Sequence, residues 1–459
     1  MPVSTTSQPA SQPASQPEVL NLLDDLIRKA KGAGADAADA VLFDSASLSL
    51  SQRFGKTEKL ERSESGDLGL RVFIGKRQAI VSSTDRSAKA LDELVERAVA
   101  MARVVPEDPF CGLADPEQIY TTLPELDVCD PSEPSAELLI ERARIAEEAA
   151  LAVEGVTNSE GADAGWSRST IAIAASNGFS GSYGVSRQSL SASVLAGTGT
   201  GMERDYDYDS KVYGSDLRDA ASIGREAGER AVRRLNPRRV KSCKVPVVFD
   251  PRVSRGLLGH LTGSISGPSI ARGTSFLKDK MGQRIFAAGI TIVDDPHVKR
   301  GLRSRPFDAE GIATTRRNLI DDGHLTTWLL DLRSARQLGL STTGHAARGT
   351  SGPPGPAPTN VYMAPGTKSR EDLLAEIPNG FYVTELMGTG VNGVTGDYSR
   401  GAAGYWIENG QIAYPVTELT IAGNLKEMFL NLEPASDLEL RFGMDAPTIR
   451  IDGLTIAGL

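Results

Sequence analysis

Hydrophobic residues near the start of the chain switch between helical and strand spacing. Over residues 18–32 they recur every three or four positions, which predicts a helix that ends at a glycine. Residues 68–74 alternate strictly between apolar and polar, as in a half-buried strand, and a turn at Gly75 leads back into a second strand. Helical spacing returns over residues 91–101. This order predicts helices packed against an antiparallel sheet.

The same kind of pattern continues beyond a proline-rich connector at residues 106–134. A helical face spans residues 135–153, and Asn177-Gly178 indicates a hairpin between two strands. A further helix is expected from Ser215 to about Leu235, where Asn236-Pro237 ends it.

The pattern changes after Lys241. Residues 245–249 form a continuous apolar run typical of a buried strand, and Asp250-Pro251 then begins a helix with a capping residue followed by proline. Between Phe381 and Leu425, glycines interrupt apolar runs that are too short for helices, so these runs are predicted to be strands joined by tight turns. Asn409-Gly410 favours a two-residue hairpin there.

These elements predict an α+β fold, with an N-terminal half of antiparallel sheet and helices followed by a β-rich C-terminal domain. The N-terminal domain is expected at residues 18–240, with sub-lobes at 18–130 and 131–240, and the C-terminal domain at 241–459. Residues 1–17 repeat Ser-Gln-Pro and contain no charged side chain, so a disordered tail is expected there.

Composition excludes several classes of function. The net charge is −9 with no sustained basic run, which argues against a direct nucleic-acid surface. Cys111, Cys129 and Cys243 lie far apart and form no CxxC, which suits a reducing cytoplasm better than a disulfide framework. No apolar run approaches membrane-spanning length, and no signal-peptide pattern is present, so we expect a cytoplasmic protein without membrane contact.

Several ordered motifs resemble one known family. The stretch TGDYSRGAAGYWIENGQIAYPVTELTIAGN (395–424) is similar to the C-terminal signature of the TldD/PmbA family, and more narrowly of its PmbA (TldE) branch, whose members are also described as modulators of DNA gyrase. Four upstream segments extend the resemblance: 245–267, 274–286, 305–311 and 341–348. The likeness therefore covers nearly everything from Lys241 onward, and more loosely the half before.

The resemblance directs attention to the helix after Pro251. In the catalytic branch of the family, the equivalent helix carries a His-Glu-x-x-x-His motif with zinc ligands and a general base. Here Gly259 and Ser264 occupy the two histidine positions, and His260 occupies the glutamate position. A catalytic zinc needs three protein ligands and a base beside its water, and this helix offers one imidazole. We therefore expect no metal in this chain.

The glycine-rich C-terminal segment is the candidate peptide-binding surface, because extended peptides are captured through backbone hydrogen bonds. The candidate groove residues are Gly388, Gly390, Gly393, Gly396, Asp397, Tyr398, Gly401 and Gly404.

Two alternative functions have some sequence basis. Ser275 and Lys278 fit the SxxK pattern of serine acyl-transferases, although neither SDN nor KTG accompanies them. Gly388–Gly393 matches GxGxxG after a predicted strand, but the helix that a dinucleotide site requires does not follow.

For the other residues that could carry chemistry, ordinary structural roles are expected. His297, His324 and His345 are remote in sequence, which does not exclude a three-histidine site assembled in space. Residues 205–209 (DYDYD) depart from a calcium loop and are expected to form a solvated acidic loop. Asp308 and Glu310 are expected to serve in a turn.

By resemblance, the chain is expected to be the non-catalytic subunit of a heterodimeric zinc metallopeptidase that processes small or unfolded peptides. The zinc would lie in a TldD-like paralogue, and this subunit would close the chamber and help hold the peptide.

Overall fold

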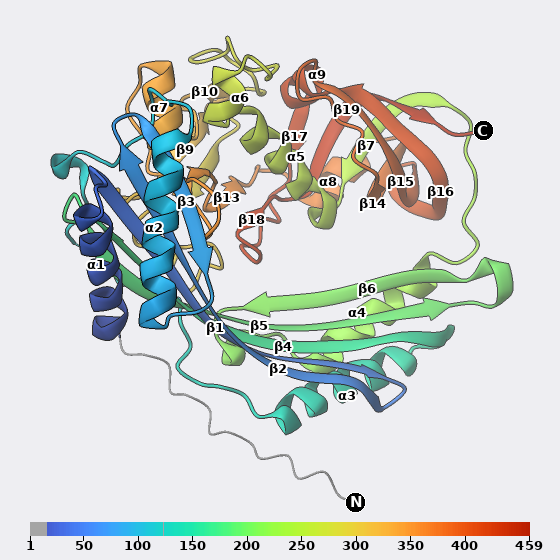
Figure 1. The fold of residues 1–459 in the computed structure, drawn as a ribbon. Helices are drawn as coiled ribbons and strands as arrows, with labels where there is room; N and C mark the ends of the chain where they lie inside the picture. The colour runs from blue at the N-terminus through green and yellow to red at the C-terminus, as the bar shows by residue number, and fades with distance from the viewer. Residues whose placement is uncertain (1–15, 123) are drawn as a thin grey trace, which may run out of the picture.

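The computed structural model describes residues 16–122 and 124–459. Most of the predicted tail, residues 1–15, lies outside this part, and α1 (Gln16–Gly32) begins directly after it. The fold is α+β as predicted: an antiparallel sheet with helices comes first, and a β-rich domain follows (Figure 1). Within the described residues, no helix is both long and apolar enough to cross a membrane.

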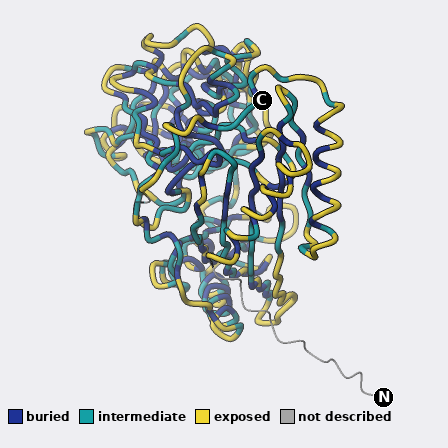
Figure 2. The backbone as a smooth tube through the Cα atoms, turned by 60° about the vertical axis from the view of Figure 1, so that its left-hand side comes forward, coloured by how far each residue is buried: buried dark blue, intermediate teal, exposed yellow. Residues whose placement is uncertain are grey.

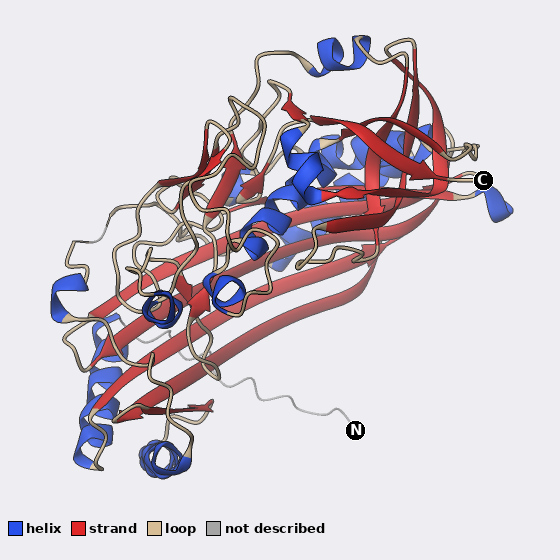
Figure 3. Ribbon diagram, turned by 90° about the horizontal axis from the view of Figure 1, so that it is seen from above, coloured by secondary structure: helices blue, strands red, loops and turns tan. Residues whose placement is uncertain are grey.

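A six-stranded antiparallel sheet dominates the N-terminal half, with strand order β3-β2-β1-β4-β5-β6. Its long strands run along the length of the molecule (Figure 3). Because β1 pairs with both β2 and β4, one sheet spans the two expected sub-lobes. The strands are β1 (Ala37–Arg53), β2 (Lys56–Ile74), β3 (Arg77–Ser83), β4 (Val156–Ala175), β5 (Ser180–Ala196) and β6 (Glu203–Lys211).

Four helices cover one face of this sheet. Even-numbered residues of β1 such as Leu42 and Leu50 point into the two helix-lined cores. The odd-numbered Val41 points to the opposite face, where it packs with Phe307 and Ala309 of the C-terminal half. Helices α1 and α2 (Ala88–Val104) cover one end of the sheet, and α3 (Ala136–Leu151) and α4 (Ala220–Arg233) cover the other (Figure 1).

The predicted N-terminal helices are confirmed, with one shifted boundary. The helix expected from Ser215 begins at Ala220, because the Asp219 side chain accepts the Ser222 N–H and caps it there. Residues Gly214–Asp216 form a short 3₁₀ turn instead. The predicted hairpin at Asn177-Gly178 joins β4 to β5.

The C-terminal half is built around a sheet of order β16-β15-β14-β7-β19-β17. Additional pairing of β16 with β19 closes it into a barrel. The predicted Asn409-Gly410 hairpin joins β15 to β16. The strands are β7 (Cys243–Phe249), β14 (Asn379–Met387), β15 (Asp397–Glu408), β16 (Gln411–Asn424), β17 (Leu432–Pro434) and β19 (Ile449–Ala457).

Shorter elements pack on this barrel and complete its core. Figure 2 shows buried residues concentrated inside both halves, with exposed ones along outer helix faces and loops. The helices are α5 (Pro251–Ser264), α6 (Gly267–Ala271), α7 (Leu332–Leu338), α8 (Arg370–Ala375) and α9 (Leu425–Leu430). The short strands are β8 (Ile292–Asp295), β9 (Arg317–Asp321), β10 (His324–Leu325), β11 (Ala346–Ala347), β12 (Gly355–Pro356), β13 (Asn360–Met363) and β18 (Met444–Asp445).

Residues 205–209 form part of edge strand β6, so the prediction of a solvated acidic loop was wrong. Asp205, Asp207 and Asp209 are buried and share one face of the strand. Asp207 pairs with arginines of the adjoining α4 region, whereas Asp205 also receives the Arg252 guanidinium from α5 at 2.8 Å. The alternating aspartates therefore fasten the N-terminal sheet to the C-terminal half.

Candidate functional site

Helix α5 begins where the sequence predicted. The Asp250 side chain accepts the Arg252 N–H at 2.9 Å and caps the helix, and Pro251 occupies its first turn. Leu257, Leu258 and Leu261 are buried in the C-terminal core. This packing fixes the direction in which the remaining residues of the helix point.

The three positions equivalent to the zinc motif make separate contacts. At Gly259, an added Cβ would meet only the Met444 sulfur of β18, at 3.8 Å. The His260 ring lies edge-on to the Tyr398 ring of β15, with 6.0 Å between centroids. The Ser264 hydroxyl donates to the His260 carbonyl at 2.8 Å, so it serves the helix backbone. The fold thus brings together His260, one of the zinc-motif positions, and Tyr398, one of the candidate groove residues.

A cation lies beside this pair. Burial lowers the pKa of His260, and the Arg400 guanidinium lowers it further. Burial also raises the pKa of Tyr398 to about 12. The Tyr398 hydroxyl and the Arg400 Nε are both buried, and neither finds a hydrogen-bond partner within the described part of the chain. Sequence reasoning missed Arg400, because a single arginine on a strand carries no recognisable pattern.

These residues do not fit a zinc site. One imidazole beside a fixed positive charge supplies a single donor and repels a second cation, whereas a catalytic zinc requires three protein ligands. Across residues 16–122 and 124–459, no group of three or more His, Cys, Asp or Glu residues is placed to hold a metal ion.

Two of the remaining histidines, His297 and His345, bind neighbouring polar groups, and His324 lies in the short strand β10. His345 is buried, with its Nε2 at 3.1 Å from Asp294 and its Nδ1 at 2.8 Å from the Thr343 hydroxyl. The His297 Nε2 lies 3.0 Å from the Thr314 hydroxyl. These contacts are typical of histidines that stabilise loops.

The glycine-rich segment forms the β14–β15 hairpin and its long turn. Strand β15 pairs with β16 on one side, which includes Asp397 and Tyr398, and from Gly401 onward it also pairs with β14, so Gly401 and Gly404 have a neighbouring strand on both sides. The exposed part is the turn at 387–395, which includes Gly388, Gly390 and Gly393. Backbone groups of the turn are also bonded within the chain: the Gly390 carbonyl accepts the Ser399 N–H at 2.7 Å, and the Gly393 carbonyl accepts the Phe276 N–H at 2.9 Å.

Close packing explains why two of these positions are occupied by glycine. A Cβ at Gly404 would overlap the Tyr382 carbonyl oxygen, and a Cβ at Gly390 would overlap the Ser399 carbonyl oxygen. Close approach of neighbouring backbones therefore requires glycine at both positions.

The structure gives no support to the two alternative sites. The buried Ser275 hydroxyl donates to the Ser264 carbonyl at 2.6 Å and accepts the Leu277 N–H at 3.0 Å, so Lys278 does not activate it. Gly388–Gly393 is followed by strand β15, which starts at Asp397, and not by a helix that could face a pyrophosphate.

Asp308 and Glu310 both lie in a turn, as expected, but they are buried. Asp308 accepts the N–H groups of Glu310 and Ile312 at 2.8 and 2.9 Å, and Glu310 accepts the Leu332 N–H at 2.8 Å. Burial first, and then Asp308 beside it, raise the pKa of Glu310 to about 8.

Family models cover most of the chain. Residues 38–102 match the PmbA/TldA metallopeptidase domain 1, residues 129–235 match the central domain, and residues 242–458 match the C-terminal domain. The chain belongs to the PmbA/TldD family. The metalloprotease PmbA of Escherichia coli O157:H7 is 41% identical over 426 residues, which is 92% of this chain and 93% of that protein.

Solved structures of PmbA/TldD-family proteins share the fold. A protein of Bacteroides thetaiotaomicron, described as a modulator of DNA gyrase, superposes with a TM-score of 0.89 at 30% identity over 96% of this chain and 99% of its own. TldE of Thermococcus kodakarensis gives a TM-score of 0.86 at 22% identity, over 95% of this chain and 100% of its own, and this likeness concerns the fold alone.

Proposed function

We propose that this chain is a PmbA/TldE-type subunit that lacks its own catalytic zinc. It would work with a TldD-like paralogue that carries the intact His-Glu-x-x-x-His helix and cleaves small or unfolded peptides. Membership of a metallopeptidase family supports the reaction class. Gly259, His260 and Ser264 stand on α5 in place of the zinc motif, which supports assigning the zinc to the other subunit.

The observation that carries the proposal is the surroundings of His260. This residue is the one imidazole of the helix, its ring packs on Tyr398, and Arg400 places a positive charge beside it. Ser264, at the position of the second zinc histidine, bonds to its own helix. A chelate needs several ligands held at once, and this helix supplies one.

The proposal predicts how metal and activity divide between two chains. The purified chain alone should hold no stoichiometric zinc and cleave no peptide, and cleavage should appear when a paralogue with the intact motif is added. Metal content and cleavage of an unfolded peptide should be measured for this chain, the paralogue and their mixture.

A variant of the helix sharpens this comparison. His260→Ala should leave the activity of the mixture largely unchanged, because the imidazole holds no metal. One equivalent of zinc in the lone chain, together with cleavage that His260→Ala abolishes, would place the catalytic centre in this chain and overturn the proposal.

A further inference from the structure

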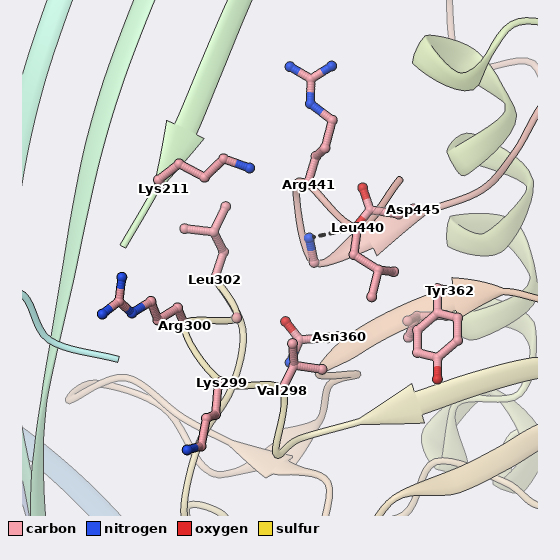
Figure 4. A pocket seen from close by; sticks show the side chains of 13 residues that line it. Lys211, Val298, Lys299, Arg300, Leu302, Asn360, Tyr362, Leu440, Arg441 and Asp445 are labelled. Atoms are coloured by element: carbon pink, nitrogen blue, oxygen red, sulfur yellow. Dashed lines mark hydrogen bonds between the residues drawn. The ribbon is translucent and has the colours of Figure 1, made fainter. Parts of the chain in front are cut away.

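A cavity lies between the two halves of the molecule, outside the site described above. It is enclosed by the end of β6, the loop at 298–302, β13 and the segment at 440–445 (Figure 4). Its volume is about 100 Å³, and a single water needs roughly 10–15 Å³ by the same kind of measure. There is therefore room for a carboxylate and part of the residue that bears it.

The cavity lies close to α5, because the segment at 442–445 contacts both. Arg255 of α5 stacks over the Phe442 ring at 4.8 Å. The Met444 sulfur faces Gly259, and the next residue, Asp445, lines the cavity. A group bound in the cavity would thus lie one strand away from the helix that corresponds to the catalytic helix of the family.

Positive charge predominates in the lining. Lys211, Lys299, Arg300 and Arg441 are cationic, and Asp445 is the one acidic residue among the lining residues. Lys211 extends from the end of β6 toward the segment that carries Arg441 (Figure 4). This concentration is unexpected in a chain with a net charge of −9.

The nearby carboxylates are shared among these cations. Arg441 lies 3.5 Å from an Asp209 oxygen and 4.0 Å from Glu439, and Lys211 lies 3.9 Å from the same Asp209 atom. Arg300 is turned outward to Asp127 and Asp216. Within the described residues, no carboxylate lies within 4.0 Å of the Lys299 ammonium group.

Asp445, the acidic residue of the lining, is bonded to its own loop. Its carboxyl accepts the N–H groups of Phe442 and Gly443 at 3.0 and 3.1 Å, so it is turned toward its own loop. Burial also raises its pKa.

A second group of cations stands behind the lining. The stem of Arg303 packs where a Cβ on Gly443 would lie. Burial lowers its pKa and the Asp445 carboxyl opposes this; the positive charges of Arg187 and Arg255 lower the pKa further, and Asp294 raises it. Arg187 is carried by β5 next to Gln188, which pairs with Lys211. Like charges held this close repel one another, and a bound anion would relieve that repulsion.

We propose that this cavity binds a carboxylate of a peptide, and specifically the free carboxylate at its C-terminal end. Lys211 and Arg441 of the lining would face it, and Arg303 lies behind them. Guanidinium and ammonium groups bind carboxylates through short, charge-assisted hydrogen bonds. The inference rests on the proposed function, since it assigns to this subunit the anchoring of one end of a peptide.

Peptide binding to the purified chain tests the inference without the paralogue or cleavage. Three fluorescein-labelled peptides of one unstructured sequence should be compared by fluorescence anisotropy: a free C-terminal acid, a C-terminal amide, and an amide whose last residue is aspartate. We expect the free acid to bind about tenfold more tightly than the plain amide, as befits charge-assisted hydrogen bonds. The aspartyl amide should bind as weakly as the plain amide, and binding as tight as that of the free acid would overturn the assignment to the C-terminal carboxylate.

Variants of the cavity cations test whether the preference for the free acid arises at this cavity. Lys211→Gln and Arg303→Gln should each bring the free acid to within about twofold of the amide, and urea unfolding confirms that the variants are folded. Lys31→Gln, on the exposed end of α1, is the matched control and should leave the preference intact. Millimolar inorganic phosphate should compete with the free acid at the wild-type site.

Each contrary result is distinguishable from failure of the proposed function. Equal binding of the acid and the amide, no binding of either at millimolar concentration, or a preference that survives both variants would overturn the carboxylate site. Zinc-dependent cleavage by the mixture of chains could still be observed in each of these cases. Conversely, zinc in the lone chain would leave the binding comparison valid.

Discussion

At the scale of single residues, Glu310 stands where the two halves of the molecule meet. It is 9% exposed and accepts one backbone N–H, from Leu332. Burial and the Asp308 carboxyl raise the pKa of Glu310, whereas Arg71 of β2 lowers it. The net result is a pKa of about 8. Burial of a carboxyl favours its neutral form, so Glu310 holds a proton at neutral pH in the folded state.

This proton makes stability depend on pH. Between about pH 4.5, the ordinary value for glutamate, and pH 8, Glu310 is protonated in the folded chain and ionised in the unfolded chain. Stability should therefore fall as pH rises through this window, by up to about 1.4 kcal/mol per pH unit from this residue. Below the window both states are protonated, and above it the cost is constant.

Glu310→Gln should flatten the dependence, because the amide keeps an oxygen for the Leu332 N–H and does not titrate. Urea unfolding between pH 5 and 9 measures the slope. Glu117→Gln, at an exposed position of the 3₁₀ turn Pro116–Gln118, is the control and should follow wild type. Identical slopes for wild type and Glu310→Gln would show that Glu310 is ionised in the folded chain at neutral pH.

At the scale of elements, helices and hairpins with regular apolar spacing or clear turn residues could be predicted from the sequence, whereas the pairing of distant strands could not. Helices α1, α2, α3 and α5 follow from their apolar spacing and caps, and the hairpin at Asn409-Gly410 follows from local turn chemistry. Strand β1 was missed because its outer half alternates with serine, as in Ser47 and Ser49, and shows little of the usual strand composition.

The same limit explains the error at β6 and the incomplete site. Asp-Tyr alternation has the period of a strand, but its aspartates are buried only because arginines from α4, α5 and distant loops reach them. His260 was found through its place in a motif, whereas its neighbour Arg400 and the cavity cations come together only in the folded chain. Ion pairs between residues far apart in the sequence cannot be inferred from the local spacing of residues.

The β14–β15 hairpin offers a test at this scale. Gly404→Val should destabilise the chain by about 1–3 kcal/mol, because its side chain would overlap the Tyr382 carbonyl and force the bulged pairing apart. Gly393→Val is the matched control in the exposed turn, where the nearest atom to an added Cβ is the Thr274 oxygen at 3.9 Å. Urea unfolding compares the two, and equal effects would contradict the packing argument.

At the scale of the whole molecule, the two halves are joined by charge as well as by apolar contact. Asp205 on β6 receives Arg252 from α5 at 2.8 Å and Arg234 from the end of α4 at 3.4 Å. Arg234 also reaches Glu385 of β14 at 2.6 Å, so the cluster links the N-terminal sheet to the barrel. The cavity proposed to bind a carboxylate lies at the other end of the same strand, at Lys211.

Removing the shared carboxylate should therefore weaken the whole fold. Asp205→Ala leaves Arg252 without a carboxylate within 4.0 Å among the described residues. Loss of one partner from a buried pair costs about 3–5 kcal/mol, and we expect about 2–4 kcal/mol here because Arg252 retains some contact with water. Glu160→Gln, which removes the exposed pair with Arg204 at the edge of the same sheet, should cost under about 1 kcal/mol.

Measuring stability at acid pH distinguishes the loss of this electrostatic interaction from a packing defect in Asp205→Ala. Burial alone would raise the pKa of Asp205, but Arg252 and then Arg234 hold it below the ordinary value of 3.8. The contribution of Asp205 is therefore fully present above pH 4 and is lost as pH falls through the lowered pKa. The difference in unfolding free energy between wild type and Asp205→Ala should be largest at pH 7 and shrink below pH 4. A difference that stays constant down to pH 2 would mean that Asp205 joins the two halves by shape and not by charge.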